Sequence, residues 1–144
     1  MTDLLSINLS DFSELNALLE RASDALDVER VLDEATAVLL NRIRTRFLAQ
    51  EDPDGTPWVE SQAARDRRES GRDGGTLFDT GTLFHSIQGF SNSPGVRGIG
   101  TDVEYADIHQ FGFDGNEERI ILGFSDDDVD IVTRLITDRL SRAL

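Results

Sequence analysis

His85 and His109 are the residues whose chemistry first suggests catalysis, because an imidazole can act as a general acid, a general base or a metal ligand. Ser86 follows His85, and Glu104 and Asp107 lie near His109 in the sequence. A hydrolase or zinc site needs a third ligand or an oriented base, and no HExxH, GxSxG or nucleotide-binding loop is present. We therefore predict no enzyme and no catalytic, cofactor-binding or metal-binding residue. A metal-dependent hydrolase centred on His109 remains as an alternative.

Acidic and arginine side chains supply the other candidate sites. The run Asp52 to Pro57 has oxygen ligands but lacks the spacing and the distant bidentate Glu of an EF-hand, so we interpret it as a tight turn. Arg42, Arg44 and Arg46 lie where an expected helix ends, and cations stabilise helix C-termini. The segment Glu60 to Arg72 alternates arginines with acids and is interpreted as a solvated helix, although it is the one place where a phosphate contact could be argued.

The composition is strongly acidic. The 144 residues include 28 acidic and 14 basic residues, all of the latter arginine, for a formal net charge of −14. Such a surface repels nucleic acid and anionic membranes, because phosphate binding needs basic clusters. A lysine-free chain in which aspartate outnumbers glutamate resembles proteins of extreme halophiles. The alternative is a GC-rich genome that encodes arginine in place of lysine.

Length and composition favour one globular domain over residues 1–144, with 38% hydrophobic residues and no cysteine. The absence of cysteine excludes disulfides and thiolate chemistry and favours an intracellular setting. No apolar run approaches the roughly 20 residues of a membrane helix, and the N-terminus lacks the features of a secretory signal.

Long helices are expected on both sides of a short central region. Apolar residues at helical spacing predict a helix from Asp27 to Phe47. Asp11 and Glu14 have the spacing of a capping box, which predicts an earlier helix within residues 1–27, a candidate docking arm. Residues 1–9 suit an extended arm or a short strand.

Capping also marks the start of the last helix. Ser125 and Asp128 have the capping-box spacing, and acids crowd the first turn, where the helix dipole favours them. Before that helix, the run Arg119 to Phe124 predicts a buried strand. Trp58 is expected to anchor its loop to the core.

Short elements fill the centre of the chain. Tyr105, Ile108 and Phe111 are expected in the core, with His109 and Gln110 nearer to a contact surface. The whole pattern predicts an α+β fold in which a small antiparallel sheet packs with long N-terminal and C-terminal helices. The expected central elements are a short helix carrying Leu83, Phe84 and Ile87 and capped by Asp79 or Thr80, strands over 88–93 and 96–101, and a second short helix over 104–111.

A series of short motifs, in this order and at this spacing, resembles the phage virion morphogenesis (tail completion) family. The matching motifs are RF at 46–47, DPDG-x-x-W at 52–58, TG-x-L-x-x-SI at 80–87, GT at 100–101 and YA-x-IHQFG at 105–112. A weaker match, R-x-x-LG at 119–123, lacks the proline that the family often has there. The resemblance covers residues 35–140. The lysine-free composition lies outside it and suggests a virus of a halophilic host.

The resemblance implies a structural virion protein without catalysis, which forms a ring at the neck, where tail meets head. Its partners would be copies of itself, connector proteins on the portal or adaptor side, and the tail tube or tail terminator. Genomic DNA would pass an acidic lumen without specific binding, and no membrane would be contacted. Assembly would take place in the host cytoplasm.

Two other functions stay open, a tail terminator ring and a small acidic regulatory binding protein. If the chain is the neck protein that the resemblance implies, the residues expected at a subunit or partner interface come from the matched motifs and from a glycine-rich strand. The edge of that strand would be free for pairing. They are Thr80, Gly81, Gly98, Gly100, Tyr105, His109, Gln110, Gly112 and Arg119.

Overall fold

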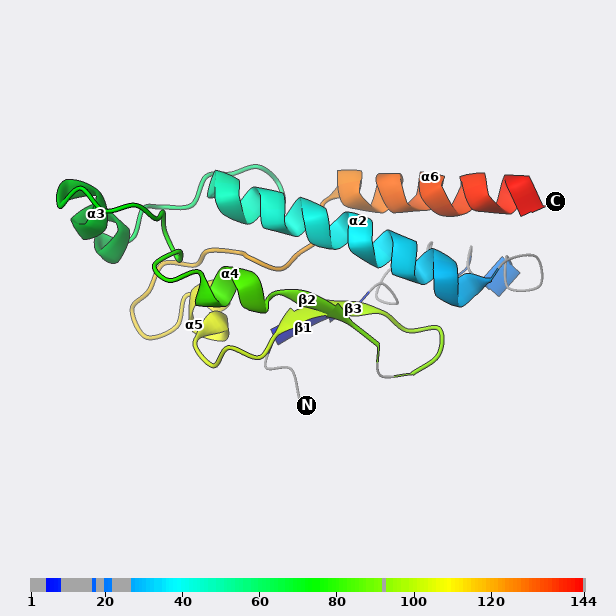
Figure 1. Cartoon of the computed structure of the whole chain (residues 1–144), viewed down its shortest axis with the longest axis horizontal. Coiled ribbons are helices and arrows are strands. Elements are labelled where there is room, and N and C mark those ends of the chain that lie inside the picture. Colours follow the sequence, from blue (N-terminus) through cyan, green and yellow to red (C-terminus); the bar gives the residue numbers. More distant parts are fainter. Residues whose placement is uncertain (1–4, 9–16, 18–19, 22–26, 92, 144) are drawn as a thin grey trace.

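The computed structural model describes residues 5–8, 17, 20–21, 27–91 and 93–143. A small sheet and short helices lie on one side of the long helix α2, and the last helix, α6, runs along its other side (Figure 1). This is the predicted α+β architecture. The elements are β1 (Leu5–Asn8), α2 (Val28–Ala49), α3 (Gln62–Glu69), α4 (Thr82–Ser86), β2 (Gln88–Phe90), β3 (Gly98–Thr101), α5 (Ala106–Phe111) and α6 (Asp126–Ala143).

Helix α2 is the scaffold on which the other elements pack. It begins where the side chain of Asp27 accepts the N–H of Arg30 at 3.3 Å, and it ends at Gln50, which adopts a left-handed conformation with φ of 63°. The helix predicted from Asp27 to Phe47 is therefore confirmed. Its buried apolar face consists of Val31, Leu32, Ala35, Leu39, Ile43 and Phe47.

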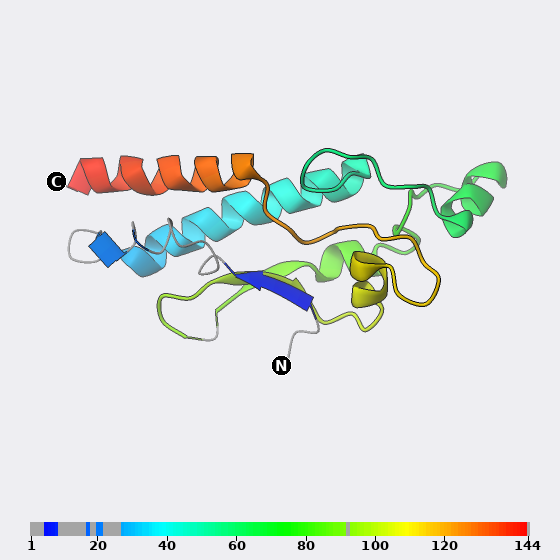
Figure 2. The ribbon, with the colours of Figure 1, turned by 180° about the vertical axis from the view of Figure 1, so that it is seen from behind.

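The sheet has three strands in the order β1-β3-β2, and both pairings are antiparallel. In the register, Gly100 of β3 lies opposite Ser6 on one side and Gln88 on the other. Figure 2 shows β1 from behind, lying against the hairpin. The prediction of a free edge at Gly98 and Gly100 is wrong, because β1, a segment distant in sequence, occupies that edge.

Aromatic side chains close the end of the core near the C-terminus of α2. The ring of Phe47 lies 5.2 Å from that of Trp58 and 5.4 Å from that of Phe84, both in edge-on geometry. Trp58 also donates its indole N–H to the carbonyl of Ile120 at 3.2 Å. The prediction that Trp58 anchors its loop to the core is confirmed.

The predicted capping box at the start of α6 is present. The N–H of Asp128 donates to the Ser125 hydroxyl at 3.1 Å, and the N–H of Ser125 donates to the Asp128 carboxylate at 2.9 Å. The strand predicted from Arg119 to Phe124 is wrong. Ile121 and Leu122 are buried as expected, but their N–H groups donate to the side-chain oxygen of Gln110, at 2.8 and 3.0 Å, instead of to another strand.

The expected helix that begins at Asp11 lies mostly outside the described residues. Of the candidate docking arm over residues 1–27, the structure describes mainly β1, which confirms a short strand within residues 1–9.

Candidate functional site

A pocket of about 330 Å³ lies between α3, the start of α4, α5 and the segment that precedes Arg119. Its lining brings together several of the residues that the sequence placed at an interface, namely Thr80, Gly81, Tyr105, His109 and Arg119. We refer to it as the α3–α4–α5 pocket.

Gly81 shapes one wall of this pocket. It is the N-cap of α4 and has a φ of 83°, a conformation that side-chain-bearing residues rarely adopt. A Cβ at Gly81 would also lie only 3.0 Å from the ring of His85. The prediction that Asp79 or Thr80 is the N-cap is wrong, because Gly81 takes that position, but the Thr80 hydroxyl does accept the N–H of Thr82 at 3.4 Å. The Thr80 hydroxyl bonds the hydroxyl of Thr82 at 2.7 Å.

Gly112 brings the opposite wall into place. It ends α5 with a φ of 71°, and a Cβ there would lie 2.9 Å from the backbone nitrogen of Glu118. The chain can therefore fold back closely, and the N–H of Arg119 donates to the carbonyl of His109 at 2.8 Å. This bond holds Arg119 beside α5.

Helix α5 buries a different face from the predicted one. Tyr105 is 43% exposed and Phe111 is 52% exposed, whereas Ala106 and Gln110 are buried. The expectation that Tyr105 and Phe111 lie in the core is wrong, and so is the placement of Gln110 near a contact surface. The reason is the pairing of Gln110 with residues 121–122, since a buried amide that satisfies several backbone groups is stable in the core. Ile108 is half-buried.

Of the other predicted interface residues, Gly98 and Gly100 lie in the central strand β3 and do not line the pocket. His85 is exposed and packs edge-on against Phe84 at 5.1 Å. Because the pocket holds only His109 of the two histidines, no pair of imidazoles meets there. Among the described residues, no group of three or more His, Asp or Glu side chains could hold a metal ion.

Two buried arginines and one acid, Asp79, line the pocket. Arg119 is only 5% exposed and donates its Nε–H to the carbonyl of Val59 at 2.8 Å. Arg67, also buried, donates to the carbonyl of Gly75 at 2.7 Å. Burial and the neighbouring Arg119 charge hold the pKa of His109 below its usual value, so this imidazole is neutral near pH 7. Such a lining suits an anion, and a carboxylate in particular.

Apolar surface is exposed close to these charges. Phe111 and Phe113 form a ring pair 5.6 Å apart and are each about half exposed. Val59, whose carbonyl binds Arg119, is 59% exposed. The rings of Tyr105 and His109 lie 6.1 Å apart in edge-on geometry. An exposed aromatic pair such as Phe111 and Phe113 is typical of protein contact surfaces.

Sequence reasoning missed two ion-pair networks, each centred on one buried charge. In the first, Asp128 of α6 is completely buried and pairs with Arg42 and Arg46 of α2. The sequence analysis explained these arginines by the helix dipole alone. Arg42, however, falls at the helical spacing of the apolar residues, which was a signal that it has a buried partner.

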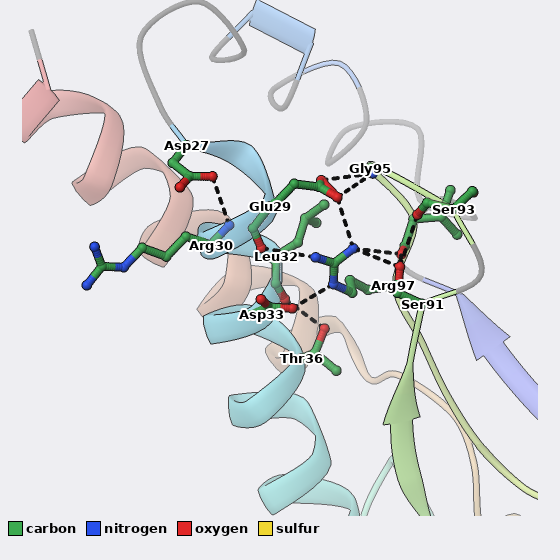
Figure 3. A network of polar contacts seen from close by, with 11 residues as sticks. Asp27, Glu29, Arg30, Leu32, Asp33, Thr36, Ser91, Ser93, Gly95 and Arg97 are labelled. Carbon is green, nitrogen blue, oxygen red and sulfur yellow. Dashed lines mark hydrogen bonds and ion pairs between the residues drawn. The ribbon is translucent and has the colours of Figure 1, made fainter.

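The second network fastens the loop between β2 and β3 to α2 (Figure 3). Arg97 is buried and donates to Asp33 at 2.7 Å and to the Glu29 carboxylate at 3.4 Å. The two oxygens of Glu29 also accept the N–H of Gly95, at 2.9 and 2.8 Å. Glu29 and Asp33 lie four residues apart on α2 and so share one face of the helix. Two acids on one helix face were the signal that an arginine could pair with them.

Comparison with known proteins agrees with the resemblance in the motifs. The model of the phage virion morphogenesis family matches residues 10–141. The chain is 29% identical over 124 residues to tail completion protein S of Escherichia phage P2, covering 74% of this chain and 83% of that protein. No solved structure matches the chain. Within the described residues, no helix is both long and apolar enough to span a membrane.

Proposed function

Since the chain belongs to the phage virion morphogenesis family, and so acts in the building of a virus tail, we propose that it is a structural subunit of the neck, where the tail is completed and joined to the head. The observation that carries this proposal is the match to a relative named for tail completion, which extends over most of both chains. The function is mechanical and needs no catalysis. The protein remains in the virion after assembly in the host cytoplasm.

We further propose that the subunits form a closed ring. A heterologous contact, in which one face of a subunit meets a different face of the next, closes into a ring when its rotation is right. The exposed Phe111–Phe113 pair and the pocket beside Tyr105 supply a face of the kind such a contact uses. Thr80, Gly81 and Arg119 line that pocket and belong to the contact.

The charge of the chain suits a passage for DNA. With a net charge of −14, a ring would present carboxylates to its lumen and would not bind the phosphate backbone. Connector proteins on the head side and the tail tube or tail terminator on the other side are the partners that this position requires. A tail terminator ring is the alternative within the same family of roles.

Disruption of the gene in the virus separates these roles. Loss of a completion or joining protein leaves filled heads beside unattached tails of normal length, whereas loss of a terminator leaves tails of uncontrolled length. Electron microscopy of the lysate distinguishes the two results. Complete infectious particles from the disrupted virus would refute both.

A further inference from the structure

We propose that the α3–α4–α5 pocket binds the carboxylate of an Asp or Glu side chain from a second copy of this chain, with Arg119 as the residue that receives it. This inference rests on the ring proposed above and names the chemistry of its subunit contact.

Arg119 stands apart from the other buried arginines. Arg46 pairs with Asp128 at 2.7 Å, Arg97 pairs with Asp33 at 2.7 Å, and Arg67 lies 4.0 Å from Asp79. No carboxylate of the described residues lies within 4.0 Å of Arg119, which is the least exposed of the four. This is unexpected in a chain with 28 acidic and 14 basic residues.

Arg119 has lost most of its hydration without gaining a counter-charge, and only its terminal amino groups keep contact with solvent in the pocket. Arg119 uses its Nε–H on the carbonyl of Val59, and its terminal amino groups have no hydrogen-bond partner among the described residues. A carboxylate from outside the subunit would accept from this free end of the guanidinium and remove the cost.

Other polar atoms of the pocket lining also lack partners. Nδ1 of His109 and Nε of Arg67 are both buried, and neither makes a hydrogen bond within the described part of the chain. Asp79 lines the pocket too, but its carboxylate is directed to Arg67 and Arg72, at 4.0 and 3.5 Å. Nδ1 of His109 and Nε of Arg67 are enclosed by protein, so the groups that could meet an incoming carboxylate are the terminal amino groups of Arg119.

The ring proposed above makes a second copy the occupant of the pocket, and the surface of that copy supplies the carboxylate. A neighbouring subunit carries the same net charge of −14 and so presents carboxylates over its surface. A buried cation that pairs with one of these carboxylates offsets part of the repulsion between two acidic subunits. Tyr105, which lines the pocket and is 43% exposed, would be covered by the same contact.

The absence of lysine makes a direct test available. Arg119→Lys introduces a single side-chain amine into a chain that has none, and a carbodiimide joins an amine only to a carboxylate in contact with it. The α-amino group is common to all variants and gives the background. The matched control is Arg134→Lys, at an exposed arginine of α6 with no described ion pair.

An equal mixture of ¹⁵N-labelled and unlabelled Arg119→Lys protein is cross-linked in molar KCl. The proposal predicts dimers with one labelled and one unlabelled chain, joined from position 119 to an Asp or Glu, and only background cross-linking in the control. Links within one chain, or no link above background, would overturn it. If isolated tails are added and position 119 then links to a different virion protein, the assignment to a second copy is wrong.

A second variant separates this proposal from the ring itself. Arg119→Met should weaken subunit association about 30-fold or more, since one partner of a buried charge pair is lost. The melting temperature of the isolated subunit should change little, because the loss of the hydrogen bond to the Val59 carbonyl opposes the relief from an unpaired charge. If wild type is a ring by light scattering and Arg119→Met associates equally well, the pocket proposal fails alone. If wild type is a monomer, the ring fails as well.

Discussion

Asp128 is the residue whose loss should cost the fold most. It is fully buried at the start of α6 and accepts hydrogen bonds from Nε of Arg42, from Nη1 of Arg46 at 2.7 Å and from the N–H of Ser125 at 2.9 Å. These contacts join α2 to α6, the two long helices. Asp128→Asn keeps the shape of the side chain but removes its charge.

The magnitude follows from what remains after the change. Removing one partner of a buried ion pair costs about 3–5 kcal/mol. The asparagine oxygen can still accept hydrogen bonds, and the Arg42 side chain is 34% exposed, so water can solvate it in part. We therefore expect the lower end, about 3 kcal/mol, which lowers the Tm of a domain of this size by about 10 °C.

Urea unfolding monitored by circular dichroism measures this loss. The matched control is Asp127→Asn, one residue earlier in α6 but exposed, which should change stability by about 0.5 kcal/mol or less. A loss below about 1 kcal/mol for Asp128→Asn, or equal losses in the two variants, would refute the reasoning about the buried pair.

Lowering the pH should weaken the stabilisation that this network provides. Burial alone would raise the pKa of Asp128, but hydrogen bonds from Arg42, from the Ser125 backbone and from Arg46 hold it below its usual value. The stabilisation is thus present above the unfolded-state pKa, about 3.9, and is lost as pH falls through the lower folded-state pKa. The Asp128→Asn variant should lose less stability over that range than wild type. An identical acid dependence would contradict this assignment.

Three further predictions concern other parts of the molecule. Arg119→Met should raise the pKa of His109, measured by NMR, but not to its usual value, because burial remains; an unchanged pKa would exclude the Arg119 charge as a cause. The pKa of His109 is lower in the folded state than in the unfolded state. The unfolded state therefore binds a proton first, and the stability of the wild-type protein falls as pH drops below about 6.5. Arg97→Met should lower the free energy of unfolding by about 1–2 kcal/mol and speed amide exchange at Gly95. An unchanged exchange rate would show that Glu29 holds the loop without Arg97. If the acidic composition reflects a halophilic host, thermal unfolding in molar KCl should occur at a clearly higher temperature than in low salt; full stability at low salt would exclude that origin.

Long helices with regular apolar spacing and helices with a local cap could be predicted from the sequence. Helix α2 is an example of the first, and the Ser125–Asp128 capping box is an example of the second. Each depends on neighbours within a few residues, so no tertiary information is needed. Thr80, Tyr105, His109 and Arg119 were named as interface candidates from family motifs and not from periodicity, and the structure places all four around one pocket.

The errors fall where a distant partner decides the structure. Helix α5 has six residues, too few for its period to show whether Tyr105 and Phe111 or Ala106 and Gln110 face the core. The run Arg119 to Phe124 has the composition of a strand, but the Gln110 amide takes the place of a neighbouring strand. The pairing of β1 with β3 joins segments that are far apart in the sequence, and no local signal specifies it.

Electron cryomicroscopy of the intact virion tests the central claim most directly. The account predicts a closed ring of this chain at the head-proximal end of the tail, with Arg119 of each subunit against a carboxylate of the next. Density for the chain at the distal end of the tail, or no density in the mature particle, would contradict it.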